Sequence, residues 1–223
     1  MGYSTDLTDR EWEIIEPLLP QKRKTNKIKW CRRVIFNGIL YQLKNCCNWR
    51  DLPKDLPPFQ TVYHYYSQWR KDGTFDKMER FCHQKLREKV GKDPEYSSLM
   101  MVDSQAVKNT CTAGKDTKGY CFYKATNGIK RHLAVDSLGF PFFLYCSKAS
   151  LSDDQGLIAM FIENINFFKS KPMNKKKITI LVDQGYHPNA IRSALKEVYP
   201  AIDKKIKFQV SEKISREQKE EKD

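Results

Sequence analysis

Two short apolar runs, each ending in Val-Asp, stand out in the pattern of hydrophobic and polar positions. Residues 99–102 are apolar and are followed by Asp103, and the mainly apolar residues 178–182 are followed by Asp183. Runs of this length predict strands that are buried on both faces of a sheet. If the strands are neighbours, both aspartates lie at one edge and can bind a divalent cation through oxygen. The alternative is that aspartate is common at strand ends because it supports turns; the matched pair favours the metal site.

Helical periodicity dominates the chain before the first of these runs. Thr8, with Glu11 three residues later, forms the pattern of a capping box and predicts the start of a helix. Apolar positions recur at helical spacing in four segments, over about residues 8–19, 29–44, 60–71 and 74–90. The periodicity then changes from helical to extended. We therefore predict a helical domain over residues 1–92, a linker over 93–98 and a second domain over 99–223.

The third predicted helix has a polar outer face. Its buried stripe is Val62, Tyr65, Tyr66 and Trp69. The side chains on or beside the opposite face can bond to base edges or phosphates: Thr61, His64, Gln68, Arg70 and Lys71. Helices separated by a turn, with such a face on the last of them, predict a helix-turn-helix module that binds DNA. The alternative is a plain helical bundle with a hydrated surface.

Extended segments alternate with helices in the second half of the chain. Helices are predicted after Ser152 and from Pro188. Besides the two apolar runs, strands are predicted over about residues 128–136, 140–147 and 206–210. The order strand, strand, strand, helix, strand, helix, strand predicts a mixed α+β fold with helices on the faces of a five-stranded sheet. In this order the fourth strand can lie parallel beside the first, which brings Asp103 and Asp183 together.

A basic cluster lies on and just before the second of these strands. Its members are suited to phosphate contacts near the metal site: Lys124, Lys130, Arg131 and His132. The alternative is that these side chains form the solvent-exposed face of a hairpin.

Charge and composition limit the kinds of partner that this chain is expected to bind. The chain has 40 Lys and Arg against 27 Asp and Glu, a net charge of +13, which indicates a polyanionic partner. No apolar stretch approaches the roughly 20 residues that span a bilayer, and the polar N-terminus does not resemble a signal peptide. We therefore expect a cytoplasmic protein without a membrane partner. The seven cysteines lack C-x-x-C spacing, which predicts free thiols and argues against structural zinc.

Several separated motifs resemble one family. The N-terminal residues 7–20, 49–53 and 61–73 resemble the start of bacterial insertion-sequence transposases of the "insertion sequence five" type. Asp103-Ser104-Gln105 and Asp183-Gln184-Gly185-Tyr186 resemble the first and second catalytic motifs of that family, and residues 128–136 resemble its basic second strand. The similarity extends over nearly the whole chain. It implies a ribonuclease-H-like DDE catalytic core behind a helix-turn-helix-like DNA-binding domain.

The resemblance implies a function as well. It implies cleavage and strand transfer of double-stranded DNA, with element terminal repeats and target DNA as partners and a homodimer on the DNA, associated with the bacterial nucleoid. Two Mg²⁺ (or Mn²⁺) ions, about 3.5–4 Å apart, would serve this chemistry. By the resemblance, Asp103 would hold both ions and Asp183 one.

The sequence departs from the family at the third acidic residue. The family's glutamate belongs to a helix after the fifth strand, in a motif resembling Arg-Trp-Val-Val-Glu-Arg, and no such motif occurs here. The glutamates of the charged tail are not assigned this role: Glu212, Glu217, Glu220 and Glu221. We therefore expect a catalytic domain that is incomplete at its C-terminus, feeble activity and one uncovered face of the sheet.

Two other functions are open at this point. An inactive DNA-binding regulator of a full-length transposase would bind DNA tightly without metal-dependent nicking. A simple ribonuclease-H-like nuclease would cleave without needing particular ends, but it has little use for a sequence-reading domain. A small-molecule enzyme is disfavoured because the chain has no Gly-rich phosphate loop or nucleophile motif.

Overall fold

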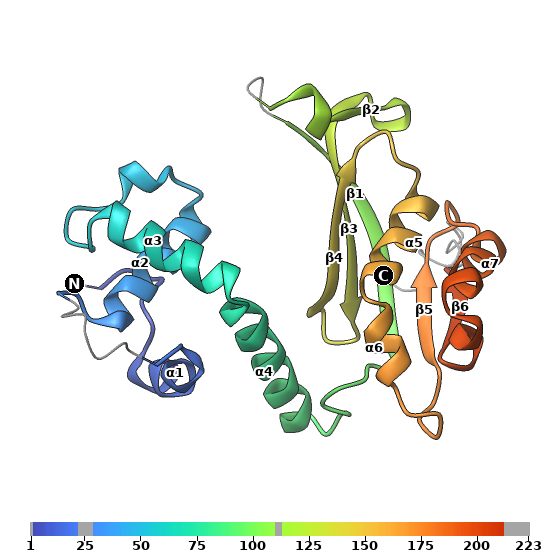
Figure 1. The fold of residues 1–223 in the computed structure, drawn as a ribbon, viewed down its shortest axis with the longest axis horizontal. Helices are drawn as coiled ribbons and strands as arrows, with labels where there is room; N and C mark the ends of the chain where they lie inside the picture. The colour runs from blue at the N-terminus through green and yellow to red at the C-terminus, as the bar shows by residue number, and fades with distance from the viewer. Residues whose placement is uncertain (1, 22–28, 110–112, 212–223) are drawn as a thin grey trace, which may run out of the picture. The chain divides into compact units, whose positions relative to one another are not determined.

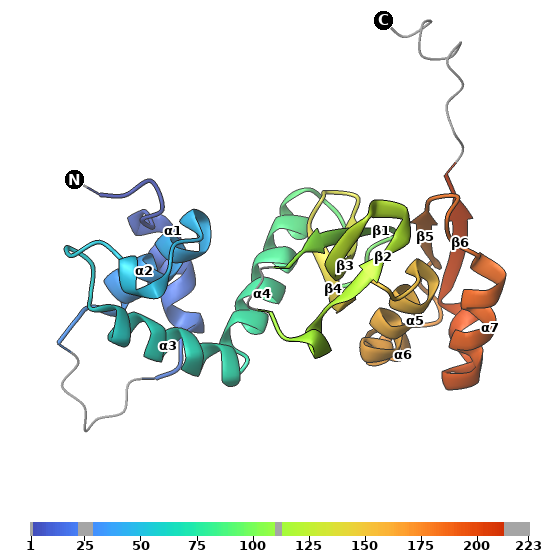
Figure 2. The same ribbon diagram turned by 90° about the horizontal axis from the view of Figure 1, so that it is seen from above.

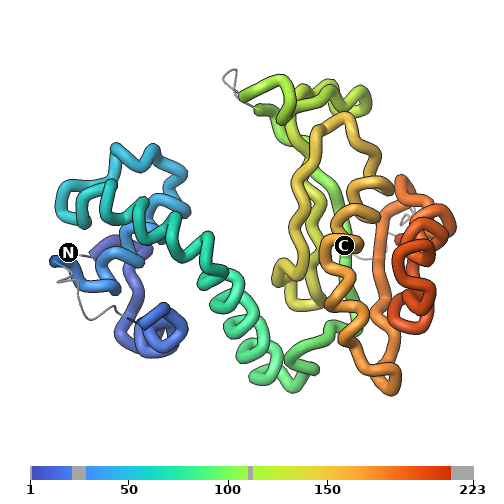
Figure 3. Tube along the Cα trace, viewed as in Figure 1, coloured from blue at the N-terminus to red at the C-terminus, as the bar shows by residue number. Residues whose placement is uncertain are grey.

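The computed structural model describes residues 2–21, 29–109 and 113–211. The chain divides into two compact units, Met1–Val90 and Gly91–Asp223, which are described separately below (Figure 3). Each unit has its own cluster of buried apolar side chains.

The first unit is helical. Its described residues form the α-helices α1 (Asp9–Ile15), α2 (Arg32–Asn45), α3 (Phe59–Lys71) and α4 (Thr74–Lys89), with short 3-10 turns η1 (Glu16–Leu18) and η2 (Trp49–Asp51) (Figure 1). The predicted capping box is confirmed: the Thr8 side-chain oxygen accepts from the Glu11 backbone N–H, and the Glu11 carboxylate accepts from the Thr8 backbone N–H. The apolar stripes of α2, α3 and α4 meet in one core that contains Ile35, Ile39, Val62, Trp69 and Met78.

The second unit is built on a mixed sheet. Its strands are β1 (Leu99–Lys108), β2 (Gly119–Cys121), β3 (Thr126–Asp136), β4 (Pro141–Lys148), β5 (Ile178–Val182) and β6 (Ile206–Val210). The strand order is β2-β3-β1-β5-β6, with β4 paired to β3. As the order of elements predicted, β1 lies between an antiparallel β3 and a parallel β5. The short strand β2, paired with β3, was not predicted and makes the sheet six-stranded.

The first strand differs from its prediction in length. β1 continues past Asp103 to Lys108, so the aspartate lies in the middle of the strand and not at its end. The cause is β3, which pairs with β1 along this polar stretch, from Asp103 opposite Leu133 to Lys108 opposite Gly128. Apolar residues marked only the buried half of the strand, whereas backbone hydrogen bonds extend it regardless of side-chain polarity.

Three helices cover one face of this sheet. They are α5 (Asp153–Glu163), α6 (Ile165–Ser170) and α7 (Pro188–Val198), followed by the 3-10 turn η5 (Pro200–Lys204) (Figures 1 and 2). The core beneath them contains Met100, Val102, Phe161, Ile180 and Ile191, all at most 4% exposed. On the opposite face Leu133 and Leu144 are 36% and 60% exposed, and no helix in the described part of this unit covers them.

Alternation along β3 decides which of its side chains face the helices. Lys130, His132, Ala134 and Asp136 are buried, whereas Arg131 between them is exposed, as the two-residue period of a strand requires. Helix α5 approaches His132 closely at Gly156, where an added Cβ would lie only 1.9 Å from the imidazole Cε1. Glycine at this position therefore permits the helix to pack directly on the histidine.

Candidate active site

The two Val-Asp motifs lie on adjacent strands at the same level. Met101 on β1 is in parallel register with Leu181 on β5. Two residues further along the chain come Asp103, within β1, and Asp183, directly after the end of β5. Both aspartates are exposed. Because the neighbouring Val102 is buried beneath the helices, Asp103 is directed to the opposite, uncovered face of the sheet.

Local backbone hydrogen bonds orient both carboxylates. Asp103 Oδ1 accepts from the backbone N–H of Ser104 at 2.7 Å, and Asp183 Oδ1 accepts from that of Gly185 at 2.9 Å. Carboxylate oxygens are the ligands that Mg²⁺ and similar hard cations prefer, so the chemistry of the pair fits a divalent ion. Within residues 2–21, 29–109 and 113–211, however, no three His, Cys, Asp or Glu side chains form a group that could hold a metal.

A buried tyrosine is close to both aspartates. Tyr186 is 4% exposed, and its hydroxyl has no hydrogen-bond partner in the described structure. Burial raises the pKa of this phenol well above its usual range, and the nearby charges of Asp153, Asp103 and Asp183 raise it further. Three carboxylates therefore act electrostatically on one neutral phenol. The Ser104 hydroxyl acts in the opposite direction and lowers this pKa, while its own hydrogen bond goes to Asp153.

Asp153, at the start of α5, links this helix to strands β1 and β3 through contacts of its side chain. Its Oδ1 accepts from the Ser104 hydroxyl at 2.6 Å and lies 2.9 Å from Lys130 Nζ. Lys130 also donates to the Leu151 carbonyl oxygen at 2.7 Å. Burial alone would raise the pKa of Asp153, but these hydrogen bonds outweigh it and lower the pKa. The carboxylate is therefore ionised, which suits its place in the first turn of α5.

Comparison with known families identifies the chain. The family described as "Transposase DDE domain" matches residues 97–223, and the family described as "Putative transposase of IS4/5 family" matches residues 7–79. The chain belongs to the DDE transposase family. A DDE domain has a ribonuclease-H-like fold, so this family match and the observed mixed sheet confirm the fold class that the sequence predicted.

Two curated relatives show weaker similarity. One is the "Insertion element IS402 uncharacterized 16.2 kDa protein" of Burkholderia cepacia, 28% identical over 109 residues, which are 46% of this transposase-family chain and 72% of that relative. The other is the "Uncharacterized protein y4sN" of Sinorhizobium fredii, 29% identical over 73 residues, which are 32% of this chain and 58% of that relative. No solved structure matches the chain.

Two of the basic residues predicted to contact DNA are buried in this transposase fold. Lys130 is 7% exposed and is held by Asp153 and Leu151, as described above. His132 is completely buried, and its Nε2 lies 3.0 Å from the Ser147 hydroxyl. Burial lowers the pKa of His132 to about 4, and the charge of Lys130 lowers it further while Asp153 opposes the change. The prediction that these two side chains contact phosphate is therefore wrong, because β3 turns them toward the helices.

The other predicted DNA contacts are accessible. Arg131 is exposed and lies opposite Gln105, two residues from Asp103, so it shares the uncovered face of the sheet. Lys124 is exposed in the 3-10 turn η4 (Phe122–Lys124). On α3, Thr61 is half-buried, whereas the remaining predicted side chains are exposed: His64, Gln68, Arg70 and Lys71.

The remaining predictions concern the C-terminal glutamates, the cysteines and helices that could span a membrane. The tail glutamates Glu212, Glu217, Glu220 and Glu221 lie outside the described residues. The six cysteines that the structure describes are free thiols, as predicted. Among the described helices, none is long and apolar enough to cross a membrane. Sequence reasoning missed Asp153, although its position next to a helix cap at Ser152 was visible, because only the fold brings it beside Ser104.

Proposed function

We propose that this chain is an insertion-sequence transposase that binds double-stranded DNA at the ends of its element and carries out metal-dependent strand cleavage and transfer. The observation that carries the proposal is the register of β1 and β5, which sets Asp103 and Asp183 at one level on adjacent parallel strands. The family match supports the transposase role itself.

In this proposal Asp103 and Asp183 hold the divalent cation, Mg²⁺ or Mn²⁺. When bound, such an ion would activate an attacking water or 3′-hydroxyl and stabilise the departing oxygen of the phosphodiester. The chain's own contribution is to hold the two carboxylates in place. Ser104 orients Asp103 through its backbone N–H and anchors β1 to α5 through its hydroxyl bond to Asp153.

DNA binding is assigned to both units. In the helical domain that we propose for residues 1–92, α3 contacts base edges and phosphates through Thr61, His64, Gln68, Arg70 and Lys71. In the proposed catalytic domain, residues 99–223, Arg131 and Lys124 are the candidates for phosphate contacts. The net charge of +13 supports a polyanionic partner. We further propose a homodimer on DNA, acting on nucleoid DNA in the bacterial cytoplasm.

Replacing one aspartate tests this function. The Asp103→Asn variant should lose the stabilisation that Mn²⁺ gives in a thermal unfolding assay, and it should lose metal-dependent nicking of a plasmid that carries the element ends. Asp116→Asn is the matched control, because Asp116 is an exposed aspartate in the 3-10 turn η3 (Lys115–Thr117) of the same unit. Equal Mn²⁺ stabilisation and nicking in wild type and Asp103→Asn would contradict the proposed metal site.

A regulator of transposition is the second candidate. It is favoured by the described residues, among which no third His, Cys, Asp or Glu side chain joins Asp103 and Asp183 in a group that could hold a metal. In the same assays a regulator would bind the element ends with high affinity and leave the plasmid intact in the presence of either metal.

A further inference from the structure

The first unit contains a pocket that the proposed function does not use. It has a volume of about 460 Å³ and is lined by Asn48, Trp49, Arg50, Asp51, Phe59 and Tyr63. This volume is within the range of about 300–1,000 Å³ that is typical of pockets for small organic ligands. The residues come from the 3-10 turn η2 and from the start of α3, two segments that the connector between α2 and α3 brings together.

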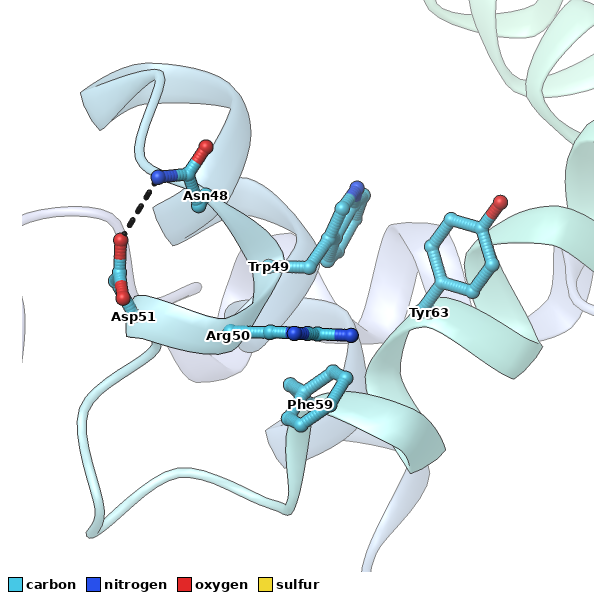
Figure 4. Close-up of a pocket in the computed structure, with 6 residues that line it drawn as sticks. All are labelled: Asn48, Trp49, Arg50, Asp51, Phe59 and Tyr63. Atoms are coloured by element: carbon cyan, nitrogen blue, oxygen red, sulfur yellow. Dashed lines mark hydrogen bonds between the residues drawn. The ribbon is translucent and has the colours of Figure 1, made fainter.

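Flat side chains form the walls of this pocket. Figure 4 shows Arg50 extending between the Trp49 indole and the Phe59 ring toward Tyr63. The rings of Trp49 and Tyr63 have centroids 5.4 Å apart and are inclined at 69°. Tyr63 is 49% exposed, so much of its ring is available for stacking. A pocket walled by aromatic rings and a planar cation suits a flat, electron-rich ligand.

The charged groups of the pocket favour a ligand that carries a phosphate. Arg50 is exposed, and within the described residues its side chain makes no hydrogen bond or ion pair. Asp51 keeps its negative charge, but it accepts from Asn48 Nδ2 at 3.0 Å, and the Arg50 side chain extends away from it (Figure 4). Helix α3 begins at Phe59 with no acidic residue in its first turn and no side-chain cap. The positive end of this helix therefore adds to the attraction of Arg50 for an anion.

The aromatic wall continues along α3 as a stripe. Phe59, Tyr63, Tyr66 and Arg70 follow one another at spacings of four, three and four residues, which places them on one side of the helix. Arg70 lies over the Tyr66 ring, 6.0 Å from its centroid. A row of aromatic side chains with a basic side chain beside it is a feature with which proteins bind unpaired nucleic acid strands. By helical spacing, this side differs from the polar side that carries His64.

From these contacts we infer that the pocket of Trp49, Arg50, Phe59 and Tyr63 binds an unpaired nucleobase of the DNA, with Arg50 and the start of α3 attracting the attached phosphate. The inference rests on the proposed function for its choice of DNA as the partner. It adds a site for a base that has left the duplex, on a different side of α3 from Thr61, His64 and Gln68, with Arg70 belonging to both proposed surfaces.

The test compares three fluorescently labelled DNA probes by anisotropy with the full chain. The probes are a single strand of 20 thymidines, a strand of equal length with abasic positions in the middle, and a 20-base-pair duplex. Tyr63→Ala and Arg50→Gln are the test variants, and Tyr63→Phe preserves the stacking surface. Tyr123→Ala is the matched control, because Tyr123 is 99% exposed in the other unit. Circular dichroism checks that every variant is folded.

We expect Tyr63→Ala to weaken binding of the thymidine strand by about 5- to 100-fold, the effect of losing one stacked base, and Tyr63→Phe and Tyr123→Ala to bind like wild type. On the abasic strand, wild type and Tyr63→Ala should bind equally. On the duplex, Tyr63→Ala should remain within about twofold of wild type. Arg50→Gln should weaken binding to both single strands, because both carry the phosphate.

Three results would overturn the inference. One is an equal loss of affinity on the thymidine and abasic strands in Tyr63→Ala. Another is unchanged DNA binding with an altered oligomeric state in sedimentation, which would assign the pocket to a second copy of the chain. The third is duplex binding by wild type with no preference for the thymidine strand over the abasic one. That result would contradict the base-binding pocket but leave the proposed function intact. Conversely, binding that depends on the bases of a single strand, without any binding of the duplex, would contradict only the proposed duplex contacts.

Discussion

His132 illustrates how burial changes the role of a single residue. In the sequence it belongs to a basic cluster, but in the fold it is completely buried between β3 and α5 with its pKa lowered to about 4. A histidine with this pKa is neutral at physiological pH and contributes no charge to a DNA surface. Its function is therefore in packing, against Gly156, and in the hydrogen bond to Ser147.

This burial predicts a pH-dependent stability. Because the folded pKa is below the unfolded value of 6.5, the unfolded chain gains a proton first as the pH falls, and the folded state loses relative stability between pH 6.5 and 4. The loss between pH 7.5 and pH 5 should be about 2 kcal/mol. Urea unfolding at these two pH values should show this difference in wild type and a smaller one in His132→Asn. His64→Asn, at an exposed histidine, is the control and should keep the wild-type difference.

Strand β3 shows the same principle for a whole element. Lys130 and Arg131 are neighbours in sequence, but the alternation of the strand buries the first against Asp153 and exposes the second on the face that Asp103 shares. Two adjacent cations therefore serve different purposes. One contributes to stability and the other is available to a phosphate.

Substituting each cation should separate these purposes. Arg131→Ala should reduce the slope of log affinity against log salt for duplex DNA by about one, because one phosphate contact is lost, with little change in stability. Lys130→Met should instead lower the free energy of unfolding by about 1.5–3 kcal/mol, because Asp153 and the Leu151 carbonyl lose a charged donor. The slope is measured by anisotropy titration from low to high salt. An unchanged slope in Arg131→Ala would show that Arg131 does not contact DNA phosphates.

At the scale of the whole molecule, the residues that the structure describes form two hydrophobic cores. Every residue of one core lies between Leu19 and Met78, and every residue of the other lies between Met100 and Ile206. The division into Met1–Val90 and Gly91–Asp223 passes between them. A unit that contains a whole core can bury its own apolar surface, which is the requirement for folding alone.

Expressed separately, fragments 1–90 and 91–223 should each fold. We expect a cooperative thermal transition by circular dichroism for each fragment, DNA binding by the first and stabilisation by Mn²⁺ in the second only. A cut at residue 128, inside β3, is the control and should leave the second fragment unfolded, because it removes the strand β1 on which the sheet is built. Unfolded fragments after the cut at residue 90 would show that the units depend on each other.

The sequence by itself determined the local features and the family of this protein. The capping box at Thr8, the stripes of α2 and α3, and the two Val-Asp strands were predictable because helix caps and hydrophobic periodicity depend on residues close along the chain. The motifs around Asp103 and Asp183 indicated the transposase family. The roles of these two aspartates and of α3 in DNA binding stay predictions.

Only the tertiary structure decided which side chains meet. The length of β1 depends on its pairing with β3, and the burial of Lys130 and His132 depends on which face α5 covers. The bond from Ser104 to Asp153 joins residues 49 positions apart. Burial and pairing of this kind result from long-range packing, which no local pattern of hydrophobic and polar residues specifies.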